Sequence, residues 1–144
     1  MKEEKDIRGF IPVQGWAHGI AHGADAIEEL PHFEYMTKDD LHQLLELARD
    51  TMTTNLAPYI CREDKRMAAP IITLLKKNIL TKEEIYSWLE SFNKIEADLK
   101  LPEDRYAIHN LTLFLKTLYF KVLQEESLDD SIAEKIKEVL FKTR

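Results

Sequence analysis

The chain has 144 residues, a length typical of one domain, and its apolar fraction of 44% is that of an ordinary soluble globular protein. Its formal net charge of −6 argues against a nucleic-acid partner, because binding to a nucleic-acid backbone needs clustered Lys and Arg. No apolar run approaches the roughly 18 residues that cross a bilayer, and the N-terminal residues are too charged for a signal peptide. The single cysteine, Cys61, cannot form an internal disulfide, so we expect a cytoplasmic protein.

The first predicted helix covers residues 16–30, and we expect the preceding extended segment, residues 1–15, to pack against it. Each residue of a helix advances the side-chain direction by about 100°. Four polar side chains of this helix then share one narrow stripe: His18, His22, Asp25 and Glu29. The opposite side carries Trp16, which we expect to anchor the helix to the core.

This polar stripe has three interpretations. A solvated outer face is the simplest, since charged residues alone would produce it. In the second, the stripe is a buried polar network in which Arg8 or Asp6 pairs with Asp25 and orients a histidine. In the third, the stripe is a metal or acid–base site.

The metal interpretation depends on the spacing of the two histidines. Residues at positions i and i+4 of a helix can bind one divalent metal ion, and an aspartate one turn on can be a third ligand. The segment is not the metalloprotease motif H-E-x-x-H, because Gly19 stands where that motif has its general base. A residue from another segment, such as His109 or Asp64, would complete the site. The candidate metal ligands are His18, His22 and Asp25.

Five further helices are predicted from apolar residues that recur at helical spacing: 37–55, 63–78, 82–97, 103–124 and 128–142. Capping pairs mark three of the starts: Thr37 with Asp40, Thr81 with Glu84, and Ser127 with Asp130. Pro70 should kink or restart its helix, because it lacks an N–H donor and clashes with the preceding turn. Four large apolar residues are expected in the core: Met67, Phe92, Phe114 and Phe120.

The predicted helices repeat in pairs. The segment that begins at Thr37 resembles the one that begins at Thr81, 44 residues later, and the segment from Glu63 resembles the one from Glu103. A period of 40 to 47 residues with two helices per unit is typical of HEAT and armadillo repeats. The sequence thus predicts an all-α, HEAT- or armadillo-like α-α superhelix of about six helices, forming a single domain over residues 1–144. An up-and-down helical bundle is the alternative.

Other polar residues have mainly structural interpretations. We interpret Cys61 as a structural thiol, although the arginine beside it would favour a lowered thiol pKa. His109 and Asn110 interrupt a strongly apolar helix, so they either belong to a buried network, which we prefer, or face a groove. Arg66 and Arg105 occupy equivalent repeat positions and are expected to tie adjacent helices together.

Several short motifs occur in a fixed order along the chain: Asp6-x-Arg8-Gly9, Gly15-Trp16-Ala17-His18 with Ala21-His22 and Asp25, Glu63-Asp64-x-Arg66-Met67-Ala68, and Asn110-Leu111 with Phe114-Leu115 and Leu118-Tyr119. In these motifs the chain resembles a bacterial family, domain-of-unknown-function family 2785 (DUF2785), over roughly residues 6–120. The resemblance implies an all-α, helical-repeat-like fold and supplies no reaction. It also implies that the chain corresponds to the C-terminal portion of longer family members.

The leading functional hypothesis is a helical-repeat module that binds a protein or a small molecule through a polar groove at the first helix. The candidate binding residues are Arg8, His18, His22, Asp25 and Glu29. The alternative is a metal-dependent or acid–base, hydrolase-like enzyme that uses His18, His22 and Asp25, with a divalent metal as its cofactor. We expect no membrane or nucleic-acid partner, and a homodimer is one assembly that the sequence allows.

Overall fold

The structure, a computed structural model, describes residues 10–11, 15–16, 23, 35–95 and 102–143. Five α-helices and one short 3-10 helix make up most of this part of the chain: α2 (Lys38–Met52), α3 (Glu63–Lys76), α4 (Lys82–Ser91), η2 (Phe92–Lys94), α5 (Pro102–Gln124) and α6 (Asp130–Lys142). The predicted all-α class is confirmed. None of the described helices is long and apolar enough to cross a membrane.

A small antiparallel pair of strands lies near the N-terminus, formed by β1 (Phe10–Ile11) and β2 (Gly15–Trp16). Trp16 therefore belongs to a strand, and the prediction that it begins the first helix is wrong. Ile, Phe and Trp favour extended backbone, and pairing with the preceding segment outweighs the helical spacing at this position. Gly23 is helical, and the other residues of the predicted helix lie outside the described part of the chain.

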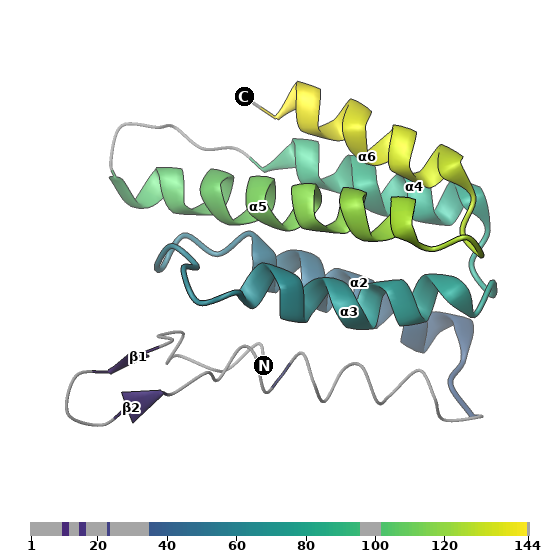
Figure 1. The fold of residues 1–144 in the computed structure, drawn as a ribbon, viewed down its shortest axis with the longest axis horizontal. Coiled ribbons are helices and arrows are strands. Elements are labelled where there is room, and N and C mark those ends of the chain that lie inside the picture. The colour runs from purple at the N-terminus through teal and green to yellow at the C-terminus, as the bar shows by residue number, and fades with distance from the viewer. Residues whose placement is uncertain (1–9, 12–14, 17–22, 24–34, 96–101, 144) are drawn as a thin grey trace.

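The helices form two rows (Figure 1). One row contains α2, α4 and α6, which run in the same direction, and the other contains α3 and α5, which run the opposite way. Within the first row, the Trp88 indole N–H of α4 donates to the Leu45 carbonyl of α2 at 2.9 Å, and the Tyr86 hydroxyl donates to the Ser131 carbonyl of α6 at 3.3 Å. Neighbours along each row are thus joined directly.

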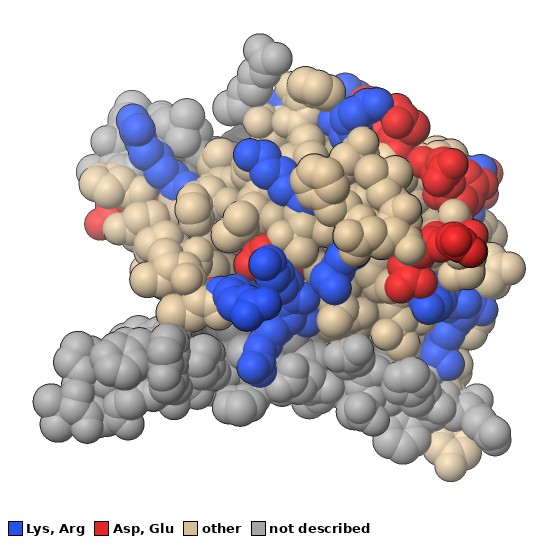
Figure 2. Space-filling view, in the orientation of Figure 1, with Lys and Arg blue, Asp and Glu red and all other residues tan. Residues whose placement is uncertain are grey.

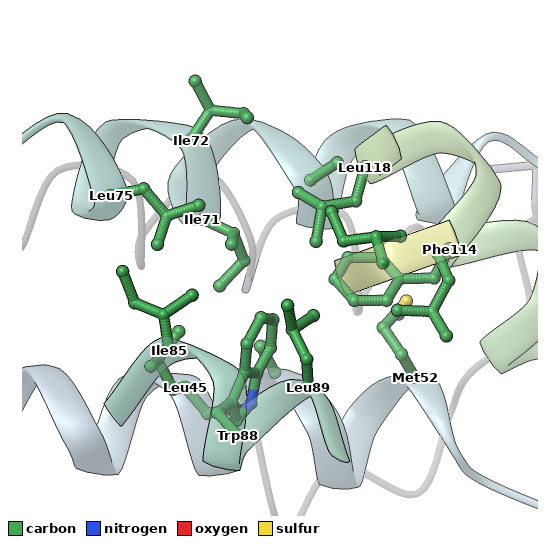
Figure 3. Close-up of a cluster of buried hydrophobic side chains, with 14 of the residues drawn as sticks. Leu45, Met52, Ile71, Ile72, Leu75, Ile85, Trp88, Leu89, Phe114 and Leu118 are labelled. Carbon is green, nitrogen blue, oxygen red and sulfur yellow. Dashed lines mark hydrogen bonds between the residues drawn. The ribbon is translucent and has the colours of Figure 1, made fainter. Parts of the chain in front are cut away.

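The core lies between the two rows and is built from residues at helical spacing. Figure 3 shows Ile85, Trp88 and Leu89 of α4 pointing toward Ile71 and Leu75 of α3. All five side chains are buried, and each contributes roughly 1.5–3 kcal/mol relative to an exposed position. The predicted apolar face of α4 is confirmed.

Three of the four large residues expected in the core are fully buried: Met67, Phe92 and Phe114. The prediction for Phe120 is wrong, because its side chain is 63% exposed. The buried side chains of α5 recur at Phe114, Leu118 and Val122, and Phe120 falls between the last two of these positions.

At two of the three helix starts that the sequence predicts from capping pairs, the predicted residue is the N-cap. Thr37 with Asp40 and Thr81 with Glu84 each form a complete capping box. The third prediction is wrong, because Asp129 rather than Ser127 is the N-cap of α6, and its carboxylate accepts from the Ser131 N–H at 2.8 Å.

The helix does not restart at Pro70, one of the two outcomes predicted there, since α3 continues from Glu63 to Lys76 without interruption. Pro70 removes the N–H that would bond to the Arg66 carbonyl one turn earlier. Its ring is buried among the core residues of α3, and this burial offsets the lost hydrogen bond.

Candidate functional site

The residues of the predicted polar stripe lie outside the described part of the chain. This applies to Arg8, His18, His22, Asp25 and Glu29. Their assignment as a binding site, metal site or buried network stays a prediction. The polar site that the structure does describe lies where residues 53–62, the connection between α2 and α3, meet α5.

Asn110 is the centre of this site and is 1% exposed. Its side-chain carbonyl accepts from the Tyr59 N–H at 2.7 Å. Its amide nitrogen donates to the carbonyls of Thr54 and Ala57, at 3.1 and 3.0 Å. One side chain of α5 thus satisfies three backbone groups of the α2–α3 connection, and the predicted buried network at His109 and Asn110 is confirmed for Asn110.

Tyr59 is held on the other side by α2, because its hydroxyl donates to the Thr51 carbonyl at 2.8 Å. Burial and the nearby Glu63 carboxylate raise the pKa of Tyr59 far above its ordinary value, so the phenol stays neutral. His109 Nε2 lies 3.3 Å from the Tyr59 carbonyl, which can only accept. This contact therefore requires the tautomer, or the cation, in which Nε2 carries a proton.

Two buried acids begin α3 beside this connection. Glu63 is 3% exposed and accepts from the Cys61 N–H at 2.7 Å. Asp64 is 5% exposed and accepts from the Thr117 hydroxyl of α5. The positive end of the helix dipole favours negative charge at these first-turn positions. The sequence did not identify Glu63 or Thr117 as part of this hydrogen-bonded site. A signal was present, because Glu63-Asp64 begins a motif that recurs at Glu103.

Cys61 does not have the lowered pKa that its arginine neighbour would favour. Desolvation and the nearby Glu63 carboxylate raise the pKa of its thiol instead. The protonated thiol is a poor nucleophile, and this agrees with its interpretation as a structural residue.

The site is suited to holding two elements together rather than to binding a metal. Asp64 and His109, the two residues considered as additional metal ligands, bond to Thr117 and to the Tyr59 carbonyl. Within the described ranges, no group of three or more His, Cys, Asp or Glu residues is placed to hold a metal ion. The hydrogen bonds of Asn110 are all directed at the chain itself.

A small hollow of about 260 Å³ lies at the opposite end of the helices, between the α3–α4 turn and the α5–α6 turn. Its apolar lining includes Leu75, Leu80 and Ile132. At its rim, Lys82 pairs with Asp129 at 2.8 Å. Ligand pockets usually enclose about 300–1,000 Å³, and here the charged groups of the rim neutralise each other. We therefore interpret the hollow as a packing gap between neighbouring helix pairs.

The chain matches the model of one protein family, described as "Protein of unknown function (DUF2785)", over residues 1–120 of 144. No curated protein and no solved structure matches it. The narrower expectation that the chain corresponds to the C-terminal portion of family members is not supported, because the match covers the N-terminal region of this chain. A match over most of the chain shows that the protein belongs to the DUF2785 family.

Proposed function

We propose that this protein is a helical-repeat module that binds another protein or a small molecule, and that it works in the cytoplasm of a bacterium. The observation that carries the proposal is the stacking of like helices at a regular interval. The hydrogen bond between His42 and Glu84 joins α2 to α4 over 42 residues, and the pair Lys82–Asp129 joins α4 to the start of α6 over 47. Asp64 and Thr117 join α3 to α5 over 53.

This arrangement favours a HEAT- or armadillo-like superhelix over an up-and-down bundle. In a superhelix each helix pair is a shifted copy of the one before, so equivalent helices are parallel neighbours. The row α2, α4, α6 has this property, and so does the row α3, α5 (Figure 1). Stacked repeats expose long helix faces, and such faces serve as protein-binding surfaces in many solenoids.

One binding surface is proposed at the polar stripe of the first predicted helix, formed by His18, His22, Asp25 and Glu29 with Arg8 beside them. The support is their common direction on a helix and the helical state of Gly23. The partner is a protein or a small molecule, and a second copy of this chain is one form that such a partner can take.

The repeat is tested by native-state hydrogen exchange of the purified protein. Stacked repeats open in units, so we expect the amides of α2 and α3 to exchange with a different opening free energy from those of α4 and α5. Exchange of all the helices as one cooperative unit would contradict the superhelix.

The binding surface is tested with the double variant His18→Ala/His22→Ala. A partner captured from the source organism is first produced pure and titrated against the wild-type chain. Lost binding with an unchanged Tm supports the proposed surface, whereas a large fall in Tm shows that the histidines belong to a buried network. Absence of saturable binding by the wild type would refute the proposed module.

The alternative is a metal-dependent or acid–base enzyme that uses His18, His22 and Asp25. It is favoured by the i, i+4 spacing of the histidines. Elemental analysis of protein purified without a histidine tag separates the two functions. Stoichiometric metal, or a rise in Tm when zinc or manganese is added, would support the enzyme; the absence of both would remove its metal-dependent form.

A further inference from the structure

The two rows of helices differ in charge. From Lys65 to the end of α3, and from Arg105 to the end of α5, the sequence contains no acidic residue. These two stretches carry the following basic residues: Lys65, Arg66, Lys76, Arg105, Lys116 and Lys121. Over their full lengths α3 and α5 each carry two acids, both in the first turn, whereas each helix of the other row carries three or more. Positive charge is therefore concentrated on one row of a protein whose net charge is −6.

The two rows also differ in how their cations are paired. Every Lys and Arg of α2, α4 and α6 has an acidic partner: Lys38 with Glu84, Arg49 with Glu46, Lys82 with Asp129, Lys135 with Glu90, Lys137 with Glu134, and Lys142 with Glu138. On the α3–α5 row, no acid of the described residues pairs with Lys65, Arg105, Lys116 or Lys121. Among the described residues, the row that carries α3 and α5 thus keeps cations without an acidic partner.

Three of these four cations, Lys65, Arg105 and Lys116, lie on one surface, whereas Lys121 is half-buried on another side of α5. On α5 the exposed side chains follow a helical stripe: Arg105, His109, Lys116, Phe120 and Leu123. Lys65 of α3 is exposed as well, and the Asp64–Thr117 hydrogen bond places its helix directly beside Lys116. We call these six residues the basic face. Figure 2 shows Lys and Arg spread over the middle of this side of the molecule, while most of the Asp and Glu in view lie toward one edge.

The basic face ends in an apolar surface. Phe120 and Leu123 are 63% and 48% exposed and continue the stripe beyond Lys116. The Phe120 ring meets Tyr119 edge to face, with ring centroids 5.3 Å apart. An exposed aromatic side chain beside unpaired cations suits a ligand that combines carboxylates with apolar side chains.

Charge complementarity distinguishes the partners that this face could take. A nucleic acid would use the cations, but it would be repelled by the acidic remainder of the molecule and would gain little from an aliphatic residue such as Leu123. An acidic peptide that carries leucine or phenylalanine uses both parts of the face. Asp64, the neighbour of Lys65 in the sequence, is buried, and its carboxylate accepts a hydrogen bond from the Thr117 hydroxyl.

We propose that the basic face binds an acidic peptide segment of a partner protein, with the carboxylates at Lys65, Arg105 and Lys116 and an apolar side chain on Phe120 and Leu123. This inference rests on the proposed function, because it names the chemistry of the protein that the module binds. It adds a second binding surface, formed by residues other than those of the predicted polar stripe.

The probe is a fluorescein-labelled peptide of fifteen residues, rich in Glu and Asp, with Leu and Phe spaced along one helical face. Binding is measured by fluorescence anisotropy at low salt and again at high salt. We expect Lys116→Glu and Lys65→Glu each to raise Kd about tenfold or more, because each replaces attraction with repulsion. High salt should weaken binding by the wild type as well, since the pairs are at the surface.

Lys94→Glu is the matched control. Lys94 is exposed on η2, and its reversal changes the net charge by the same amount, so its Kd should stay within about twofold of the wild-type value. Phe120→Ala should weaken the Leu/Phe peptide but not a version with Ser at the apolar positions. A Tm measurement of each variant confirms that it is folded.

The outcomes separate this inference from the proposed function. If the peptide does not bind, or if Lys94→Glu weakens it as much as Lys116→Glu does, the basic face is not its site. Tighter binding of an oligothymidine of the same length, with the same dependence on Lys116, would assign the face to single-stranded nucleic acid and overturn the peptide. The proposed function does not depend on these two results. It is supported if the helices exchange in separate units and a native partner binds saturably, even when the basic face does not bind the peptide.

Discussion

Asn110 does more than any other described polar residue to fix the α2–α3 connection. Its three hydrogen bonds use both amide protons and the carbonyl oxygen of one buried side chain. Only the carboxamide of Asn or Gln offers two donors and an acceptor in one plane without a charge. The connection carries Tyr59 and Cys61 and leads directly into the buried acids of α3, so the position of that whole segment depends on one residue of α5.

We expect Asn110→Ala to destabilise the protein by at least about 2 kcal/mol, because it leaves the buried Tyr59 N–H and two carbonyls without partners. Urea unfolding of the variant measures the loss. The control is Asn55→Ala, an exposed residue of the same connection, which should change the free energy of unfolding by less than about 0.5 kcal/mol. A similar small effect for Asn110→Ala would show that water replaces its hydrogen bonds.

At the scale of the helix, the start of α6 shows how a local signal can point to the wrong residue. Ser127 with Asp130 has the spacing of a cap, but Asp129 is the residue that accepts from the Ser131 N–H. Asp129 also pairs with Lys82 of α4, at 2.8 Å. Lys82 and Asp129 are 47 residues apart in the sequence, so the residues around Ser127 do not indicate this contact.

Asp129→Ala should therefore lower the free energy of unfolding by about 1 kcal/mol, the usual value of an N-cap. Ser127→Ala should leave it within about 0.5 kcal/mol of the wild type. Thermal unfolding of both variants under the same conditions shows which of the two residues caps α6. Equal losses would mean that Ser127 caps the helix in solution.

The sequence predicts the existence and order of α2 to α6 because each helix repeats its apolar residues at helical spacing. It fails at Trp16, which pairs with Phe10 in a short antiparallel hairpin instead of beginning a helix. It also fails at Phe120, which falls between the buried positions Leu118 and Val122 of α5 and faces outward. At the candidate site, the polar pair His109-Asn110 indicates a buried network, but nothing local identifies the Thr54, Ala57 and Tyr59 backbone as its partner. The stripe from His18 to Glu29 stays a prediction.

Over the whole molecule, ion pairs link one helix to the next along the α2, α4, α6 row. Among the described acids of this row, Glu84 has three partners: Lys38, His42 and the Thr81 N–H. The Thr81 N–H, Lys38 and His42 together hold the pKa of Glu84 at about 2, below its ordinary value of 4.5. A carboxyl whose pKa is lower in the folded protein stabilises it above the ordinary pKa, and this contribution is lost as the pH falls through the folded pKa.

We expect the wild-type chain to be more stable than Glu84→Gln at neutral pH. The difference should narrow below pH 4.5 and vanish near pH 2, because protonated Glu84 no longer attracts Lys38. Chemical unfolding at a series of pH values measures the difference, and Glu83→Gln, an exposed neighbour, is the control. A difference that does not depend on pH would show that the Glu84 charge has no part in stability.

The regular interval between contacting residues also bears on how the chain reaches this structure. The hydrogen bonds and ion pairs that join its described helices connect residues 42 to 53 positions apart, and none of them joins the start of the described segment to its end. Closing loops of this moderate length carries a similar entropic cost at each step. Neighbouring helices can therefore dock on one another without waiting for the two ends of the described segment to meet.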